Sequence, residues 1–138
     1  MVEYTKFIVF ILQIFHIKSS FDAIKDLAVR GAPAIGIFAG YCMALFSKNN
    51  DIYALKKYLD SSRPTAVNLS WATARIVKAY ESGKNLLDEA IAIHKEDIEM
   101  CKRISEYGLS LLNDGDTILT HCNAGELAPC KSGLVSSE

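Results

Sequence analysis

The order of apolar and polar residues divides the chain into an apolar lead-in, a series of helices and a polar tail. Residues 7–17 are rich in isoleucine, phenylalanine and valine without helical spacing, which predicts one or two buried strands. After this run the apolar residues recur at three- and four-residue steps, as is typical of helices. With Ser19 or Ser20 as the first capping residue, the expected helices are 20–27, 34–47, 51–61, 65–81 and 85–112.

The second and fifth of these helices carry the clearest packing signals. Helix 34–47 is apolar almost all round and has Gly36 and Gly40 four residues apart, so we expect it to lie at the centre of a helical core with a neighbouring backbone close to it. Trp71, in helix 65–81, is interpreted as a core residue, and His94 as a hydrogen-bonded packing residue. The interior face of the fifth helix is predicted to contain Leu87, Ile91, Ile98, Cys101, Ser105 and Leu112.

A turn signal, Asn113-Asp114-Gly115, separates the helices from a short segment with strand propensity at residues 116–121. The polar residues 123–138 offer little material for a sheet around that strand. The predicted fold is therefore mainly α, with residues 1–112 as a helical domain that includes the strand-like lead-in 1–17. Residues 113–138 would begin a second, truncated domain.

Composition places the chain among ordinary globular proteins. Half of its 138 residues are apolar, and 15 basic residues against 16 acidic ones give a formal net charge of −1, which offers no footprint for nucleic acid or anionic membrane. The apolar lead-in is too short to span a bilayer as a helix. Four separated cysteines form no C-x-x-C pair, so we predict no metal site, no cofactor and a reducing, cytoplasmic setting.

Two arginines stand just before prolines that are predicted to begin helices, in Arg30-Gly31-Ala32-Pro33 and Arg63-Pro64-Thr65. A helix start directs unpaired N–H groups and positive partial charge outward, so a guanidinium beside it makes a site for phosphate or carboxylate. Two such sites suggest a phosphorylated small molecule as the ligand. A plain turn with a solvated arginine is an equally good interpretation of each motif alone.

The cysteines differ in their predicted surroundings. Cys122 falls where the strand 116–121 ends, and ligands gather at the carboxyl edge of open α/β sheets. Its thiol is a candidate nucleophile, acid or base, although a half-buried structural cysteine is the more common case. Cys42 and Cys101 lie on apolar helical faces and are expected in the core.

Three motifs together give the chain a family resemblance. VRGAPAIG at residues 29–36, SRPTAVNLSWA at residues 62–72 and GDTILTHCNAGELA at residues 115–128 resemble the methylthioribose-1-phosphate isomerase family of methionine salvage. The resemblance implies a helical N-terminal domain followed by a Rossmann-like domain whose first strand is 117–121. It also implies conversion of 5-methylthioribose 1-phosphate to 5-methylthioribulose 1-phosphate.

By the same resemblance, Arg30, Gly31, Ala32 and Arg63 would bind the sugar phosphate, and Cys122 would be the catalytic cysteine. The family pairs that cysteine with an aspartate from the second domain, so this chain is expected to be an inactive N-terminal fragment that forms a homodimer or meets a complementing C-terminal half. Two alternatives stay open. One is an isomerase of 5-deoxyribose 1-phosphate or ribose 1,5-bisphosphate, and the other is an assembly subunit similar to the regulatory subunits of initiation factor 2B.

Overall fold

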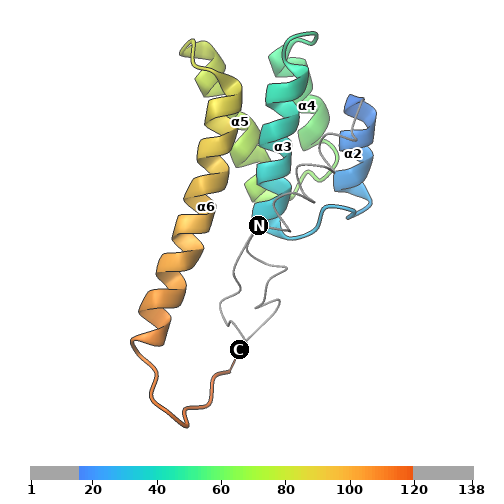
Figure 1. The fold of residues 1–138 in the computed structure, drawn as a ribbon. Helices are drawn as coiled ribbons and strands as arrows, with labels where there is room; N and C mark the ends of the chain where they lie inside the picture. Colours follow the sequence, from blue (N-terminus) through green and yellow to red (C-terminus); the bar gives the residue numbers. More distant parts are fainter. Residues whose placement is uncertain (1–15, 120–138) are drawn as a thin grey trace.

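The computed structural model describes residues 16–119, and the predicted strands of the lead-in, Cys122 and the polar tail lie outside these residues except for the last two lead-in positions. The described part is a bundle of helices (Figure 1). The helices are α2 (Ile17–Lys25), α3 (Ala32–Phe46), α4 (Ile52–Asp60), α5 (Val67–Glu81) and α6 (Leu86–Leu109). The prediction of a mainly helical fold is confirmed.

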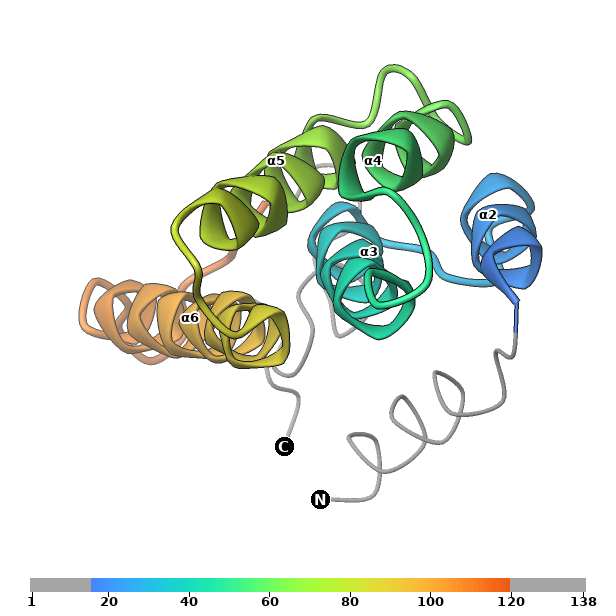
Figure 2. The same cartoon turned by 90° about the horizontal axis from the view of Figure 1, so that it is seen from above.

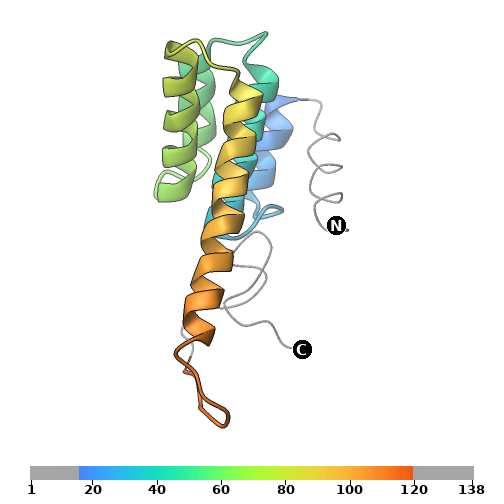
Figure 3. The same ribbon diagram turned by 60° about the vertical axis from the view of Figure 1, so that its left-hand side comes forward.

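Successive helices run in alternating directions, so every second connection lies at the same end of the bundle (Figure 1). The connections 26–31 and 61–66, which hold the two arginine motifs, therefore share one end. We call it the motif end. Helix α6 runs toward the motif end and continues past it, beyond the start of α3 (Figures 1 and 3).

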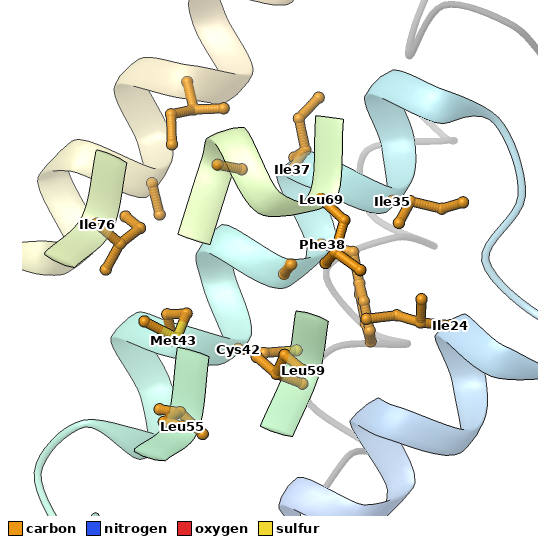
Figure 4. Packing of buried hydrophobic residues seen from close by; sticks show 14 of the residues in the cluster. Ile24, Ile35, Ile37, Phe38, Cys42, Met43, Leu55, Leu59, Leu69 and Ile76 are labelled. Atoms are coloured by element: carbon orange, nitrogen blue, oxygen red, sulfur yellow. The ribbon is translucent and has the colours of Figure 1, made fainter. Parts of the chain in front are cut away.

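Helix α3 lies at the centre, as its apolar sequence predicts. It contacts α2, α4, α5 and α6, and the view along the bundle places it among them (Figure 2). A helix that is apolar all round can be stable only where neighbours cover every face. The core that results draws side chains from α2, α3, α4 and α5 (Figure 4). Its largest fully buried members are Phe38, Ile24, Ile37, Met43, Leu55, Leu59, Leu69 and Ile76.

The two glycines of α3 face different partners. A Cβ added at Gly36 would lie 2.7 Å from the backbone oxygen of Asn68 in the first turn of α5. A Cβ at Gly40 would meet Ile93 of α6 at 3.6 Å, an ordinary contact distance. The close approach predicted from the glycine pair is thus confirmed at Gly36, where the backbones of α3 and α5 leave no room for a side chain.

Several predicted boundaries are wrong. Helix α2 begins at Ile17 after the N-cap His16, so neither Ser19 nor Ser20 is its cap, and Ile17 is helical rather than extended. The helix ends at Lys25, and Leu27 adopts a left-handed backbone conformation with φ of 58° that no helix can continue. Ser20 lies inside the helix and is fully buried.

The second-domain predictions remain open. Residues 117–119 are not assigned to a strand in the described part of the chain, and the rest of the predicted strand lies outside it. The strand and the division at residue 113 therefore stay predictions. No helix within residues 16–119 is long and apolar enough to cross a lipid bilayer.

Candidate functional site

The first motif forms the start of α3. Gly31 is its N-cap, with a φ of 96° that favours glycine, and Ala32 and Pro33 occupy the first two helical positions. The expected proline at the helix start is confirmed to within one residue. No side chain caps this helix start, so its first-turn N–H groups face outward without a side-chain acceptor. Arg30 is exposed directly beside them.

The second motif forms a turn before α5 rather than the helix start itself. The N–H of Ala66 donates to the carbonyl of Arg63 at 3.0 Å, which closes a four-residue turn with Pro64 in its second position, where proline is favoured. Helix α5 begins only at Val67, so the prediction that Pro64 opens the helix is wrong. This helix also lacks a side-chain cap.

The two helices that start at the opposite end from residue 51 onward are capped by their own side chains. Asp51 accepts from the N–H of Ala54 at 2.7 Å, and Asn85 accepts from the N–H of Leu87 at 2.9 Å. Helix α2 also starts at that end, without such a cap. At the motif end, by contrast, both helix starts are left open. That arrangement suits an external anion.

A hollow of about 390 Å³ lies between the starts of α3 and α5 and the flank of α6. Pro33 and Gly36 line it from α3, and Asn68 and Trp71 from α5. Glu96, Asp97 and Met100 line it from α6. The structure therefore brings the first turns of both motif helices to a single hollow.

Arg63 lines a second hollow of about 530 Å³, on the α4 side of α5, together with Lys56, Lys57 and Asp60. Lys56 forms an ion pair with Asp60, and Asp60 also accepts a hydrogen bond from Thr73 at 2.7 Å. Arg30 lines neither of these two hollows. Within residues 16–119, neither Arg30 nor Arg63 is paired with a carboxylate, so both guanidinium groups can receive an anion from outside.

Trp71 was expected in the core, and that prediction is wrong. Its side chain is 51% exposed at the hollow, and the Arg75 guanidinium lies 5.6 Å from its ring centroid. The buried face of α5 contains Leu69, Ala72, Thr73, Ile76 and Val77 instead. The sequence held a signal for this outcome, because residues 68, 71, 75 and 78 share one helical face and three of them are polar.

Arg75 joins α5 to α6. Its guanidinium donates to Glu89 at 2.6 Å and to both carboxylate oxygens of Glu96 at 2.5 and 2.7 Å. The hydrogen bond from Arg75 lowers the pKa of Glu96 below its ordinary value. This ion-pair group fixes the wall of the hollow beside Trp71.

The other titratable residues of the described part have structural surroundings. His94 is buried, and its Nδ1 lies 3.0 Å from the Tyr41 hydroxyl, so its predicted packing role is confirmed. Cys42 and Cys101 are buried as predicted. Burial raises the pKa of the Cys42 thiol to about 12, against a smaller lowering by the Ser20 hydroxyl. Residues 16–119 contain no group of three or more side chains that could hold a metal ion.

Comparisons with known proteins agree on one family. Residues 28–135 match the initiation factor 2 subunit family. The chain is 57% identical over 116 residues to a putative methylthioribose-1-phosphate isomerase of Methanocaldococcus jannaschii, covering 83% of this chain and 35% of that protein. It is 49% identical over 136 aligned residues to a 5-deoxyribose 1-phosphate isomerase of Clostridium botulinum, covering 85% of this chain and 39% of that protein.

Solved structures give the same result. The 5-methylthioribose 1-phosphate isomerase of Pyrococcus horikoshii superposes with a TM-score of 0.73 at 38% identity, covering 85% of this chain and 38% of that one. The delta subunit of translation initiation factor eIF-2B from A. fulgidus superposes with a TM-score of 0.68 at 39% identity, covering 86% and 40%. The chain thus spans well under half the length of each of these relatives.

Proposed function

Because the chain belongs to the initiation factor 2 subunit family, we propose that it forms the phosphate-binding part of a sugar-phosphate isomerase. The substrate we infer is an aldose 1-phosphate with an apolar group on carbon 5, either 5-methylthioribose 1-phosphate or 5-deoxyribose 1-phosphate. Both names come from relatives that are 57% and 49% identical to this chain.

One observation carries the proposal: two unpaired arginines lie in connections at the same end of the bundle, each just before a helix start without a side-chain cap. Arg30 adjoins the start of α3, and Arg63 lies in the turn before α5. An isolated surface arginine would not account for both features together. A phosphate would receive backbone N–H groups at the helix start and charge-assisted hydrogen bonds from the guanidinium.

The proposed division of roles follows the first motif closely. Gly31, with its positive φ, turns the chain so that the N–H groups of the first turn of α3 are accessible, and it has no side chain to exclude a phosphate. Ala32 would contribute a backbone N–H, and Arg30 a guanidinium. Arg63, with Lys56 and Lys57 close by, would supply the second positive group.

Cys122 is the proposed catalytic cysteine, and it lies outside the described residues. Isomerisation of an aldose to a ketose moves hydrogen from carbon 2 to carbon 1, which needs a group that takes up a proton and a group that returns it. We propose that Cys122 takes part in this transfer and that its acidic counterpart belongs to the larger part of the family protein. The chain by itself would then bind substrate with little or no turnover.

The direct test is calorimetric titration of the purified chain with 5-methylthioribose 1-phosphate, 5-deoxyribose 1-phosphate, inorganic phosphate and unphosphorylated methylthioribose. We expect both sugar phosphates to bind and the unphosphorylated sugar to fail. Arg30→Ala and Arg63→Ala should each weaken binding by roughly 10- to 100-fold, because a hydrogen bond to a charged group contributes about 1.5–3 kcal/mol. Lys48→Ala is the matched control, since Lys48 is exposed beyond the far end of α3.

Two results would contradict the proposal. If both arginine variants bind as the Lys48→Ala control does, the motif end is not the phosphate site. If the chain turns over substrate rapidly without another protein, it does not need a second acid–base group from elsewhere.

A second candidate function follows from the structural likeness to the eIF-2B delta subunit, at 39% identity. A chain of this kind would assemble with other subunits, without binding a sugar phosphate. The same titration separates the two, because an assembly subunit would give no heat with either sugar phosphate and no response to Arg30→Ala.

A further inference from the structure

Helix α6 carries a seam of residues that is buried along its first half and exposed along its second. Positions 90, 93, 97, 100, 104 and 107 follow one another at alternating steps of three and four, so they share one side of the helix. Ala90, Ile93 and Asp97 are buried. The next three positions hold Met100, Ile104 and Tyr107, whose side chains are 53%, 44% and 72% exposed.

The seam emerges because α6 is longer than the helix it packs against. Helix α6 has 24 residues and α3 has 15, which at about 1.5 Å per residue leaves α6 roughly 13 Å longer. The excess projects past the motif end, where no described element covers it (Figures 1 and 3). The side that contacts α3 higher up is therefore uncovered there.

Helix α5 extends this apolar surface to the end of the bundle. Val67 and Trp71 are 76% and 51% exposed, and both line the same hollow as Met100. Together Val67, Trp71, Met100, Ile104 and Tyr107 form a corner, with the end of the bundle as one side and the projecting part of α6 as the other. We call these five residues the apolar corner. None of them carries a charge, although the remainder of α6 is rich in charged residues.

We propose that the apolar corner is the docking surface for the larger remaining part of a family protein, the part that this chain does not match in its relatives. That part makes up most of each relative, since the matched segment covers only 35–40% of their lengths. It would dock against the motif end, beside both arginine connections. The inference rests on family membership and the exposed seam, and not on the proposed phosphate chemistry.

A second copy of this chain fits the corner less well. From Met100 to Tyr107 the exposed seam covers roughly 10 Å, or two turns, whereas a paired-helix interface is sustained over three or four heptads. A stable interface buries about 800 Å² on each partner. A compact domain can reach that area by contacting both sides of the corner, which two crossing helices cannot.

The test uses the chain together with the unmatched remainder of the Methanocaldococcus jannaschii relative, expressed separately, without any sugar phosphate. We expect a complex in sedimentation and a measurable dissociation constant by calorimetry. The double variant Ile104→Gln/Tyr107→Gln should weaken binding by about 10- to 100-fold, because two large apolar side chains lose their burial. Both residues are exposed, so circular dichroism should show the helices intact.

The matched control is Lys102→Gln/Glu106→Gln. It alters a neighbouring face of the same helix segment, removes the exposed pair in which the two groups are 3.8 Å apart, and leaves the net charge unchanged. Its binding should equal that of the parent chain. Trp71 is the only tryptophan, so its emission in a dilution series of the chain alone reports any self-association at the corner.

Three outcomes would overturn the proposal. The remainder of the relative does not bind at micromolar concentration, or both double variants weaken binding equally, or the chain alone dimerises in a way that Ile104→Gln/Tyr107→Gln abolishes. Loss of sugar-phosphate binding would leave this result untouched, because no sugar is present in the experiment.

Discussion

The contact between Gly36 and the backbone of α5 gives the sharpest prediction from this structure. Substituting Gly36 by alanine places a methyl group 2.7 Å from the carbonyl oxygen of Asn68 and 3.2 Å from its carbonyl carbon. Backbone atoms cannot rotate away as a side chain can, so α5 must move relative to α3. Overpacking of this kind costs about 1–3 kcal/mol.

Gly40 supplies an internal control in the same helix. Gly40→Ala would place its methyl group 3.6 Å from Ile93 and 3.9 Å from Ala90, which are ordinary contact distances. Both substitutions gain the same helix propensity, about 1 kcal/mol for alanine over glycine. Gly40→Ala should therefore stabilise the fold by about 1 kcal/mol, while Gly36→Ala should be neutral or destabilising by up to about 2 kcal/mol.

The measurement is urea unfolding followed by far-UV circular dichroism for the parent chain and both variants. The quantity that matters is the difference in the free energy of unfolding between the two variants, expected to be about 1–3 kcal/mol in favour of Gly40→Ala. A Gly36→Ala variant as stable as Gly40→Ala would refute the close approach of α3 and α5. Trp71 emission should change only in Gly36→Ala, because Gly36 and Trp71 line the same hollow.

Two further predictions concern titratable groups. Arg75→Gln removes the hydrogen bonds to Glu89 and Glu96 and should lower the free energy of unfolding by about 1 kcal/mol at neutral pH. Since Arg75 lowers the folded-state pKa of Glu96, that carboxylate stabilises the fold above its unfolded-state pKa and loses this contribution as the pH falls through the folded value. The difference between the parent chain and Glu96→Gln should accordingly vanish in acid, and a difference that grows on acidification would contradict the assignment. Cys42, whose thiol pKa is raised to about 12, should react with iodoacetamide only as fast as the chain unfolds, which mass spectrometry of labelled peptides can check.

The helical part of the fold was predictable because local signals agreed with the packing. Asp51 and Asn85 are capping residues in both the sequence pattern and the structure. The all-apolar sequence of α3 required cover on every side, and the structure provides it. Where the signals were local and strong, the helix boundaries came within about two residues.

The errors have a common physical origin in which face of a helix is covered. Leu87 and Trp71 were assigned to the interior from their size and spacing, yet they are 52% and 51% exposed. In α6 the buried face runs through Ala90 and Ile93 instead, because these smaller side chains lie against Gly40 of α3. Spacing fixes which residues share a face, but only the neighbouring helix decides which face is buried.

The geometry of the motif end depends on parity and on length, neither of which a single motif reveals. In a bundle of alternating helices, connections separated by two helices lie at the same end, so the motifs before α3 and α5 come together without any contact between their side chains. The long α6 then adds a wall to that end, because its seam continues past the start of α3. A docked domain at this wall would close the motif end from outside and bring its own groups against Arg30 and Arg63. On this view the phosphate-binding connections and the apolar corner share one end because the catalytic site is assembled between two parts of the family protein, and loss of docking should reduce turnover more than it reduces phosphate binding.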